Sequence, residues 1–344
     1  MRSPRPAGDL LSGTALFGEP VTEPAVSLDD VFALDADMRA FVEQRVADAG
    51  SMPNKLRRLL EGMQTAGLFS LDYSVAATRT VAETFHDRVG NCLSFTMLFV
   101  ALARAAGVDA RYQMVDVPPS WSAESGFVVL TNHINARVRG RGQPDYVVDF
   151  NQEEFKSHYV THGVSDRYAA ALFYNNKGVE ALLDEDYRAS FVNFRAAIET
   201  YPDLAAAWVN LGLLYSKRGR PEQAEAAYQK ALDLDDDNQT AMTNLAALYT
   251  RAGDAERAEL YRQRIRRHQQ QNPYYHFFLA RAAFEQKHFA EALELVDKAL
   301  KLKRDEQFYL LQGQAFDRLG ESRNAASSFA RARQVALKDG RAVY

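Results

Sequence analysis

The chain contains a single cysteine, Cys92, in a setting where its thiol could act as a nucleophile. Gly90 stands two residues before it, and an apolar helical pattern follows at once. A histidine, His133, lies downstream in a strand-like stretch, and Asp149 ends the next such stretch. A thiol, an imidazole base and a carboxylate that orients the base are the three groups that nucleophilic thiol catalysis needs.

The local setting of the cysteine favours a reactive thiol. A thiol reacts as its thiolate, and a helix N-terminus or an imidazolium lowers the pKa of a free thiol from about 8.5 by several units. Gly90 allows a tight turn, so we expect Cys92 on the first turn of a helix, where unpaired N–H groups favour negative charge. The same N–H groups could bind an oxyanion. His133 would accept the thiol proton and later give it to the leaving amine, while Asp149 would hold the imidazole tautomer.

His133 and Asp149 lie on the two arms of one expected hairpin. They share a face of the sheet only if their residues are opposed in register. A two-residue loop at Arg141 and Gly142 would place His133 opposite Phe150, whereas a three-residue loop centred on Arg141 would place it opposite Asp149. We therefore predict an odd-length loop or a bulge here.

The elements that must position these residues are helices first and strands second. Capping residues and apolar spacing predict helices that begin near Ser27, at Pro53, at Thr78 and at Cys92. The pattern then changes period, and strands are expected at 110–117, 126–138 and 145–150. Residues 28–167 are thus predicted to form an α+β domain with the cysteine helix packed on antiparallel strands. The preceding residues 1–27, which contain four prolines, are predicted to be a disordered or loosely docked arm.

A second region, residues 168–337, has an internal repeat. Small residues recur in its helices at steps of 34, 34, 34 and 33 residues: Gly178, Gly212, Ala246, Ala280 and Gly313. About five helix pairs fit, with the third degraded because Arg262 and Ile265 occupy its aromatic and alanine places. Residues 338–344 are left as a C-terminal tail.

The repeat resembles the tetratricopeptide repeat (TPR), which implies an all-α superhelical solenoid with a concave face. Asn176, Asn210 and Asn244 are spaced 34 residues apart, at a place that faces this groove in TPR proteins. The resemblance therefore implies asparagines that bind the backbone of a protein or extended peptide, since an amide both donates and accepts hydrogen bonds. Asparagines that merely pack between helices are the alternative.

The first domain resembles the transglutaminase-like superfamily, and most closely its bacterial members with TPR repeats behind the catalytic domain. The resemblance rests on these residues, in order: Thr78, Thr80, Ala82 and Phe85, then Gly90 and Cys92, then Asn132, His133 and Asp149. It implies a papain/transglutaminase-like fold with a Cys92–His133–Asp149 catalytic triad. Relatives often add an oxyanion donor before the cysteine, for which Tyr73 and His86 are candidates. Many relatives have an aromatic residue after the histidine, where this chain has Ile134.

We therefore expect a cysteine protease-like hydrolase or acyltransferase that acts on a peptide or side-chain amide through an acyl-enzyme on Cys92. Hydrolysis is favoured over transfer to an amine because water is always present and no amine site is visible. The alternative is a non-catalytic TPR adaptor with a relict first domain. No cofactor is expected. His158 and His162, with Glu154 one turn earlier, suggest a structural metal site as a third possibility, but three or four ligands are needed and no convincing completion is present.

The bulk composition excludes several other classes. The chain has 344 residues, 47% hydrophobic and 25% charged, with a net charge of −4. Its pI is near 6.0, which gives no indication of nucleic-acid binding. No apolar run approaches the ~20 residues of a transmembrane helix. The first twenty residues do not form a signal peptide, so a cytoplasmic protein is expected, or a periplasmic or exported one if a signal was removed before this numbering begins.

Overall fold

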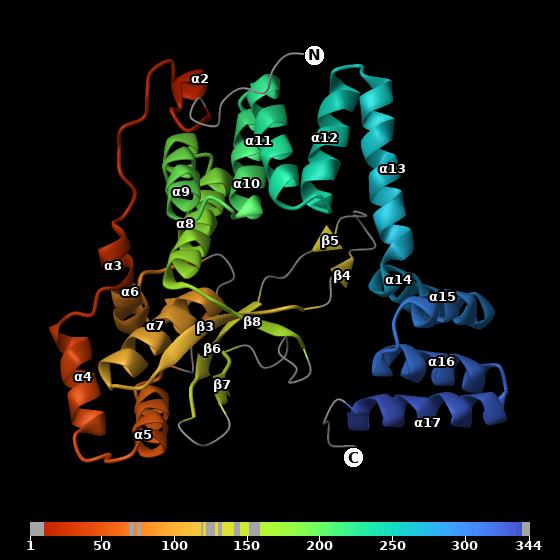
Figure 1. The fold of residues 1–344 in the computed structure, drawn as a ribbon, viewed down its shortest axis with the longest axis horizontal. Coiled ribbons are helices and arrows are strands. Elements are labelled where there is room, and N and C mark those ends of the chain that lie inside the picture. The colour runs from red at the N-terminus through yellow and green to blue at the C-terminus, as the bar shows by residue number, and fades with distance from the viewer. Residues whose placement is uncertain are drawn as a thin grey trace. The chain divides into compact units, whose positions relative to one another are not determined.

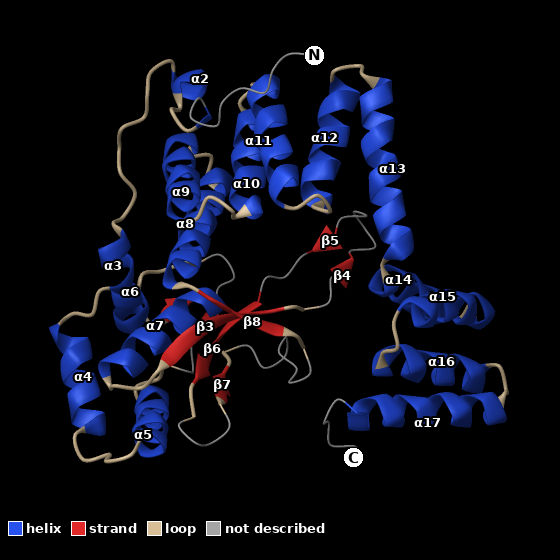
Figure 2. Cartoon of the chain, in the orientation of Figure 1, coloured by secondary structure: helices blue, strands red, loops and turns tan. Residues whose placement is uncertain are grey.

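The structure is a computed structural model that describes residues 10–68, 72–73, 77–117, 120–121, 128–129, 133–140, 145–150 and 159–338. The chain divides into two compact units. Unit 1 comprises Met1–Asp116 and Asn132–Leu248, and unit 2 comprises Val117–Thr131 and Tyr249–Tyr344. Helices dominate both the N-terminal region and the repeats, and a small sheet lies in the N-terminal domain (Figures 1 and 2).

Of the predicted helices before the cysteine, the first begins at Ser27, whereas the one predicted from Thr78 begins at Val81, with Thr80 as its N-cap. After the short α2 (Thr14–Phe17), the chain forms α3 (Leu28–Phe32), α4 (Ala36–Val46), α5 (Met52–Thr65) and α6 (Val81–Asp87). The Ser27 side chain caps α3. Thr80 and Glu83 form a reciprocal capping box at the start of α6, so two N–H groups that the helix itself leaves unpaired are bonded there.

The cysteine helix α7 (Cys92–Ala105) begins and ends where the sequence predicts. Asn91 is its N-cap, and its side-chain oxygen accepts the N–H of Ser94. Gly107, just beyond the C-terminus, has a left-handed φ of 74°, a conformation that favours glycine at the end of a helix. Most of the side chains of α7 are buried, which agrees with its nearly uniform apolar character.

The main sheet has four antiparallel strands in the order β7-β6-β3-β8. They are β3 (Ala110–Val115), β6 (His133–Val138), β7 (Tyr146–Val148) and β8 (Thr161–Val164). The prediction of one strand over 126–138 is wrong, because β6 begins at His133 and β5 (Val128–Val129) pairs with β4 (Ser120–Trp121) in a separate sheet. Strand β8, which contains Gly163, was not predicted.

Ten helices between residues 166 and 338 form the five predicted repeats. Four pairs are α8 (Asp166–Leu183) with α9 (Tyr187–Thr200), α10 (Ala205–Lys217) with α11 (Pro221–Leu234), α14 (Pro273–Glu285) with α15 (Phe289–Leu302), and α16 (Glu306–Arg318) with α17 (Ser322–Lys338). The third repeat consists of α12 (Gln239–Arg251), within which the unit boundary falls, and α13 (Ala255–Gln271).

The recurring glycines have a packing reason. A methyl group on Gly178 would lie 2.5 Å from the ring of Phe194, and one on Gly212 would lie 2.6 Å from the ring of Tyr228. The aromatic ring of each second helix therefore occupies the space that a side chain on the first helix would need. In the degraded third repeat the aromatic residue is displaced by one position, and Tyr261 stacks on Tyr249 with ring centroids 5.8 Å apart.

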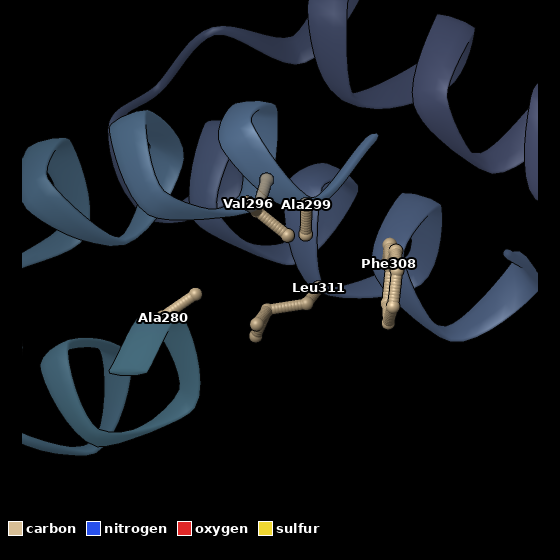
Figure 3. Packing of buried hydrophobic residues seen from close by; sticks show 5 residues of the cluster. All are labelled: Ala280, Val296, Ala299, Phe308 and Leu311. Carbon is tan, nitrogen blue, oxygen red and sulfur yellow. The ribbon is translucent and has the colours of Figure 1, made fainter. Parts of the chain in front are cut away.

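A cluster of buried apolar residues joins the last two repeats inside unit 2. Figure 3 shows side chains from α14, α15 and α16 converging on a common space. The buried members are Ala280, Val296, Ala299, Phe308 and Leu311. Tyr274 and Phe277 of α14 pack against the ring of Phe308, and the ring centroids of Phe277 and Phe308 lie 4.7 Å apart.

Of the two alternatives predicted for the N-terminal arm, disordered or loosely docked, residues 10–27 take the docked one and pack on the first two repeats in unit 1. Leu10, Leu16 and Val21 are buried. The Tyr215 hydroxyl donates to the Leu10 carbonyl at 2.6 Å, and Arg195 donates to the carbonyls of Val21 and Glu23. Repeat side chains thus bond an extended backbone that has few partners of its own. Residues 1–9 and 339–344 lie outside the described residues.

Within the described parts of the chain, no helix combines the length and the apolar character that crossing a membrane requires.

Candidate active site

Cys92 is the first residue of α7 and is partly exposed. The backbone N–H groups of Cys92 and Leu93 lie in the first turn of α7. In a first turn no preceding turn supplies carbonyl acceptors for the N–H groups. The N–H of the next residue, Ser94, is bonded to the Asn91 side chain at 3.0 Å. The thiol therefore lies where the helix dipole favours a negative charge.

The chain reverses before the cysteine at Arg88, not at the glycine to which the sequence assigns the turn. Arg88 has the left-handed φ of 58° and ends α6. Gly90 lies in the short strand β2 (Val89–Gly90), which pairs in parallel with β1 (Asp72–Tyr73). The reason for a glycine at 90 is close packing, because a methyl group there would lie 2.8 Å from Ser94 Cβ.

His133 and Asp149 are in direct contact. The ring Nε2 of His133 lies 2.6 Å from Asp149 Oδ2, and the two side chains are 0% and 6% exposed. Asn135 Nδ2 donates to the same carboxylate oxygen at 2.7 Å. With Nε2 directed at Asp149, Nδ1 is the ring nitrogen left for the thiol, and Cys92 is among the groups that raise the pKa of His133.

The strand register explains why these side chains meet. Ala136 pairs with Val148 and Val138 with Tyr146. Continued by one step, this register places Asn135 opposite Asp149 and His133 diagonal to it, all on one face of the sheet. The prediction of an odd number of residues in the connection between the two strands is therefore correct. The prediction that His133 lies directly opposite Asp149 is wrong. Loop residues 141–144 lie outside the described residues.

The charge on His133 follows from competing effects. Burial acts to lower the pKa of His133, but its hydrogen bonds to Asp149 and Cys92, together with the negative charges of both partners, raise the pKa to about 9. The imidazole thus keeps its proton at neutral pH, although it is almost completely removed from water.

Two further contacts hold the strands against α7. The Thr96 hydroxyl donates to the Ile134 carbonyl at 3.2 Å, which fixes β6 beside the cysteine helix. Phe150, directly after Asp149, packs against Phe95 and Phe99, with ring centroids 6.1 and 6.2 Å apart. Asn135 is the site residue that sequence reasoning missed, although its two-residue spacing from His133 on a strand places both on one face.

The two candidate oxyanion donors, Tyr73 and His86, lie in different surroundings. The backbone of Tyr73 pairs with Gly90, close in sequence to Cys92, but its side chain lies outside the described residues. His86 is exposed and lies 2.6 Å from Asp35, the N-cap of α4, and this contact raises the pKa of His86. Its described contacts therefore tie His86 to α4.

The metal site raised as a third possibility falls mostly on residues that the structure does not describe. His158 and Glu154 lie outside the described residues, and His162 is 3.5 Å from Asp116. Within the described ranges, the potential ligands close enough to share a metal ion are Asp35, Asp37 and His86.

The asparagines of the repeats are half-buried on the first helices of the first three repeats. Asn210 uses its amide within the protein, because its Nδ2 donates to Asn175 Oδ1 of α8 at 2.8 Å. Helix packing therefore occupies at least one of the three.

In unit 2 a pocket of about 380 Å³ lies between α14 and α16, lined by Phe277, Arg281, Phe284, Glu285, Gln307, Leu310, Leu311 and Gln314.

Comparison with known families agrees with this division of the chain. Residues 39–169 match the profile of the transglutaminase-like superfamily. Residues 170–309 match the profile described as the cytochrome c-type biogenesis protein H TPR domain. The chain therefore carries a transglutaminase-like superfamily domain followed by a TPR domain, in the predicted order.

Solved structures that resemble part of the chain include MamA, at 18% identity over 50% of this chain and 94% of that chain, with a TM-score of 0.28. PilF of Pseudomonas aeruginosa matches at 21% identity over 49% and 78%, with a TM-score of 0.30. YrrB, described as a TPR protein with an unusual peptide-binding site, matches at 16% over 48% and 86%, with a TM-score of 0.27. Such low scores carry no weight for function. No curated protein matches the chain.

Proposed function

We propose that this protein is a thiol hydrolase or acyltransferase that acts on a peptide or side-chain amide, with a Cys92–His133–Asp149 triad. The observation that carries the proposal is one buried imidazole whose Nε2 lies 2.6 Å from a carboxylate oxygen, which leaves Nδ1 for the chain's single thiol, and Cys92 is among the groups that raise the pKa of this imidazole. This is the arrangement that thiol catalysis requires.

The chemistry follows from these contacts. Cys92 Sγ attacks the amide carbonyl carbon as a thiolate, and the N–H groups at the start of α7 stabilise the oxyanion. The tetrahedral intermediate then expels the amine, which takes a proton from His133. Water, or an acceptor amine, next gives a proton to His133 and attacks the thioester, which releases Cys92. Asp149 orients the ring, with Asn135 bonded to the same carboxylate oxygen.

The repeats would bring a protein or extended peptide to this site. Two features support recruitment: half-buried asparagines on three successive first helices, and the pocket between α14 and α16, where apolar side chains could receive one from the ligand. Because Asn210 already bonds Asn175, Asn176 and Asn244 are the stronger candidates for contact with a peptide backbone.

The test is the rate at which iodoacetamide alkylates the protein between pH 5 and 10. Cys92 is the sole cysteine, so the intact mass reports one site. In the wild type we expect fast reaction that persists well below pH 8, because a protonated His133 stabilises the thiolate. In His133→Ala the rate should fall at neutral pH and follow an ordinary thiol. His288→Ala, which changes an exposed histidine in unit 2, is the matched control and should behave as wild type.

A wild-type profile of an ordinary thiol, unchanged by His133→Ala, would contradict the proposal. The non-catalytic adaptor would then be the better interpretation, with a first domain that retains the fold alone. Peptide-amide turnover that is lost in Cys92→Ser would complete the case for catalysis.

A further inference from the structure

A path of hydrogen bonds runs from the first repeat helix to the N-terminus of the cysteine helix. Glu180 of α8 accepts the backbone N–H of Thr78 through Oε1 at 2.7 Å. The Thr78 hydroxyl accepts Asn91 Nδ2 at 2.9 Å. The other end of the Asn91 amide caps α7 by accepting the Ser94 N–H. All four residues belong to unit 1.

The path lies mostly out of contact with water. Thr78 is 1% exposed and Asn91 is 6% exposed, while the Glu180 side chain is 19% exposed. Buried polar groups that lose a partner destabilise the arrangement that leaves them unbonded, and a bond to a carboxylate is stronger than one between neutral groups. The orientation of Asn91 is therefore defined from both ends of its side chain.

Glu180 is the member of the path that comes from outside the transglutaminase-like domain. It lies 102 residues after Thr78, and its second oxygen pairs with Lys177 Nζ at 3.1 Å on the same helix. Asn91 alone is enough to cap α7. The bond from Glu180 of the repeat helix to Thr78, which in turn bonds Asn91, is therefore an added constraint. This constraint acts one residue from the thiol.

We propose that Glu180 is a positioning residue for Cys92, acting through Thr78 and Asn91, so that the first TPR helix forms part of the support of the reactive thiol. This inference rests on the proposed thiol chemistry. It assigns α8 a second role besides that of a repeat that binds a partner. Small displacements of a nucleophile relative to its base cause large losses of rate, so a support of this kind should be visible in reactivity.

The experiment compares the alkylation profiles of the full-length wild type, Glu180→Ala and Glu180→Gln. Removing the acceptor in Glu180→Ala should slow alkylation at pH 7 by about tenfold, with little change at pH 10, where any thiol is ionised. Glu180→Gln keeps an acceptor oxygen for Thr78 and should retain most of the wild-type rate. Glu199→Gln, an exposed change on α9, is the matched control. An unfolded chain would also show the profile of an ordinary thiol, so the comparison is made only between variants that are shown to be folded.

Thr78→Val provides an independent variant, because it removes the hydroxyl that accepts Asn91 while keeping the side-chain shape. It should reproduce the effect of Glu180→Ala, and the double variant should be no slower than either single one, since both interrupt one path. If the rate losses of the two single variants added in full in the double variant, the two residues would act independently, and the proposed path would be wrong.

A normal wild-type profile that remains unchanged in Glu180→Ala and Thr78→Val would overturn this inference and leave the proposed function intact. An ordinary-thiol profile in the wild type would overturn both. Circular dichroism melting of each variant identifies any that fail to fold, and if Glu180→Ala is one of them, Thr78→Val decides the comparison.

Discussion

His133 combines complete burial with a positive charge at neutral pH. Burial lowers the pKa of His133, but the Asp149 carboxylate and Cys92 together outweigh this loss of hydration. A buried ion pair of this kind is weak evidence for stability as a whole. Here it sets the protonation state of the group beside the thiol, which is a functional property.

This pairing predicts how stability depends on pH. The folded pKa of His133, about 9, lies above the ordinary value of 6.5, so its contribution is fully present below pH 6.5 and is lost as the pH rises to about 9. In Asp149→Asn the largest negative neighbour is removed, and the loss of stability over this pH range should shrink. Urea unfolding at pH 6, 7.5 and 9 measures the effect.

Asn135→Ala is the control for that measurement. It removes a donor to Asp149 but leaves the carboxylate charge beside His133. The pH dependence should therefore stay close to that of the wild type. Equal flattening of the pH dependence in both variants would mean that the site had collapsed and that charge was not the cause.

At the scale of elements, the packing of the two helices within a repeat depends on the contact between a glycine on the first helix and an aromatic ring on the second. Alanine normally stabilises a helix by about 1 kcal/mol over glycine. In Gly178→Ala the new methyl group would lie 2.5 Å from the Phe194 ring, which is fully buried and cannot move away. We expect a net destabilisation of about 1–2 kcal/mol from overpacking, measured by denaturant unfolding.

Gly62→Ala in α5 is the matched substitution. Its methyl group would meet the Arg45 side chain at 3.0 Å, and that chain is flexible and can shift. The intrinsic helix preference should then prevail, so stability should be unchanged or slightly higher. Similar losses in the two variants would show that the ring contact is not the cause at Gly178.

The elements differ in how well the sequence predicts them. Helix starts such as Ser27, Thr80 and Asn91 are local, because the capping group lies within three residues of the N–H that it binds. The three residues of the proposed triad also follow from the sequence alone, since motif and order select them.

What the sequence could not predict depends on contacts distant along the chain. The register that places Asn135 opposite Asp149 is set by pairing across β6 and β7, and strand β8 is defined mainly by its pairing with β3. The bond between Glu180 and Thr78 joins two domains that the sequence treats as separate. The role of Gly90 was misassigned because close packing and a left-handed turn both select glycine.

At the scale of the whole chain, the N-terminal arm is an integral part of unit 1. Arg195→Ala removes two bonds to the backbone of the arm, at Val21 and Glu23. We expect faster proteolytic cleavage within residues 10–27 and a lower melting temperature. Arg267→Ala, which changes an exposed residue of α13, is the control. Unchanged cleavage in Arg195→Ala would mean that the apolar contacts of the arm suffice.

The repeats also support the first domain in a way that the sequence does not indicate. From the sequence, a chain without 171–344 should keep the reactivity of its thiol toward small reagents. The structure argues against this, because the deletion removes Glu180 and the helix that packs beside α7. Substitutions within the full-length chain are therefore the better test of recruitment.

The docked arm also has a consequence for the order of folding on the ribosome. Leu10 bonds Tyr215, which lies 205 residues later in the chain. At about 5–20 residues per second, the arm is synthesised roughly 10 to 40 s before its partner. During that interval Leu10, Leu16 and Val21 lack the repeat surface that covers them in the folded chain. The arm thus reaches its native place only long after it has been synthesised.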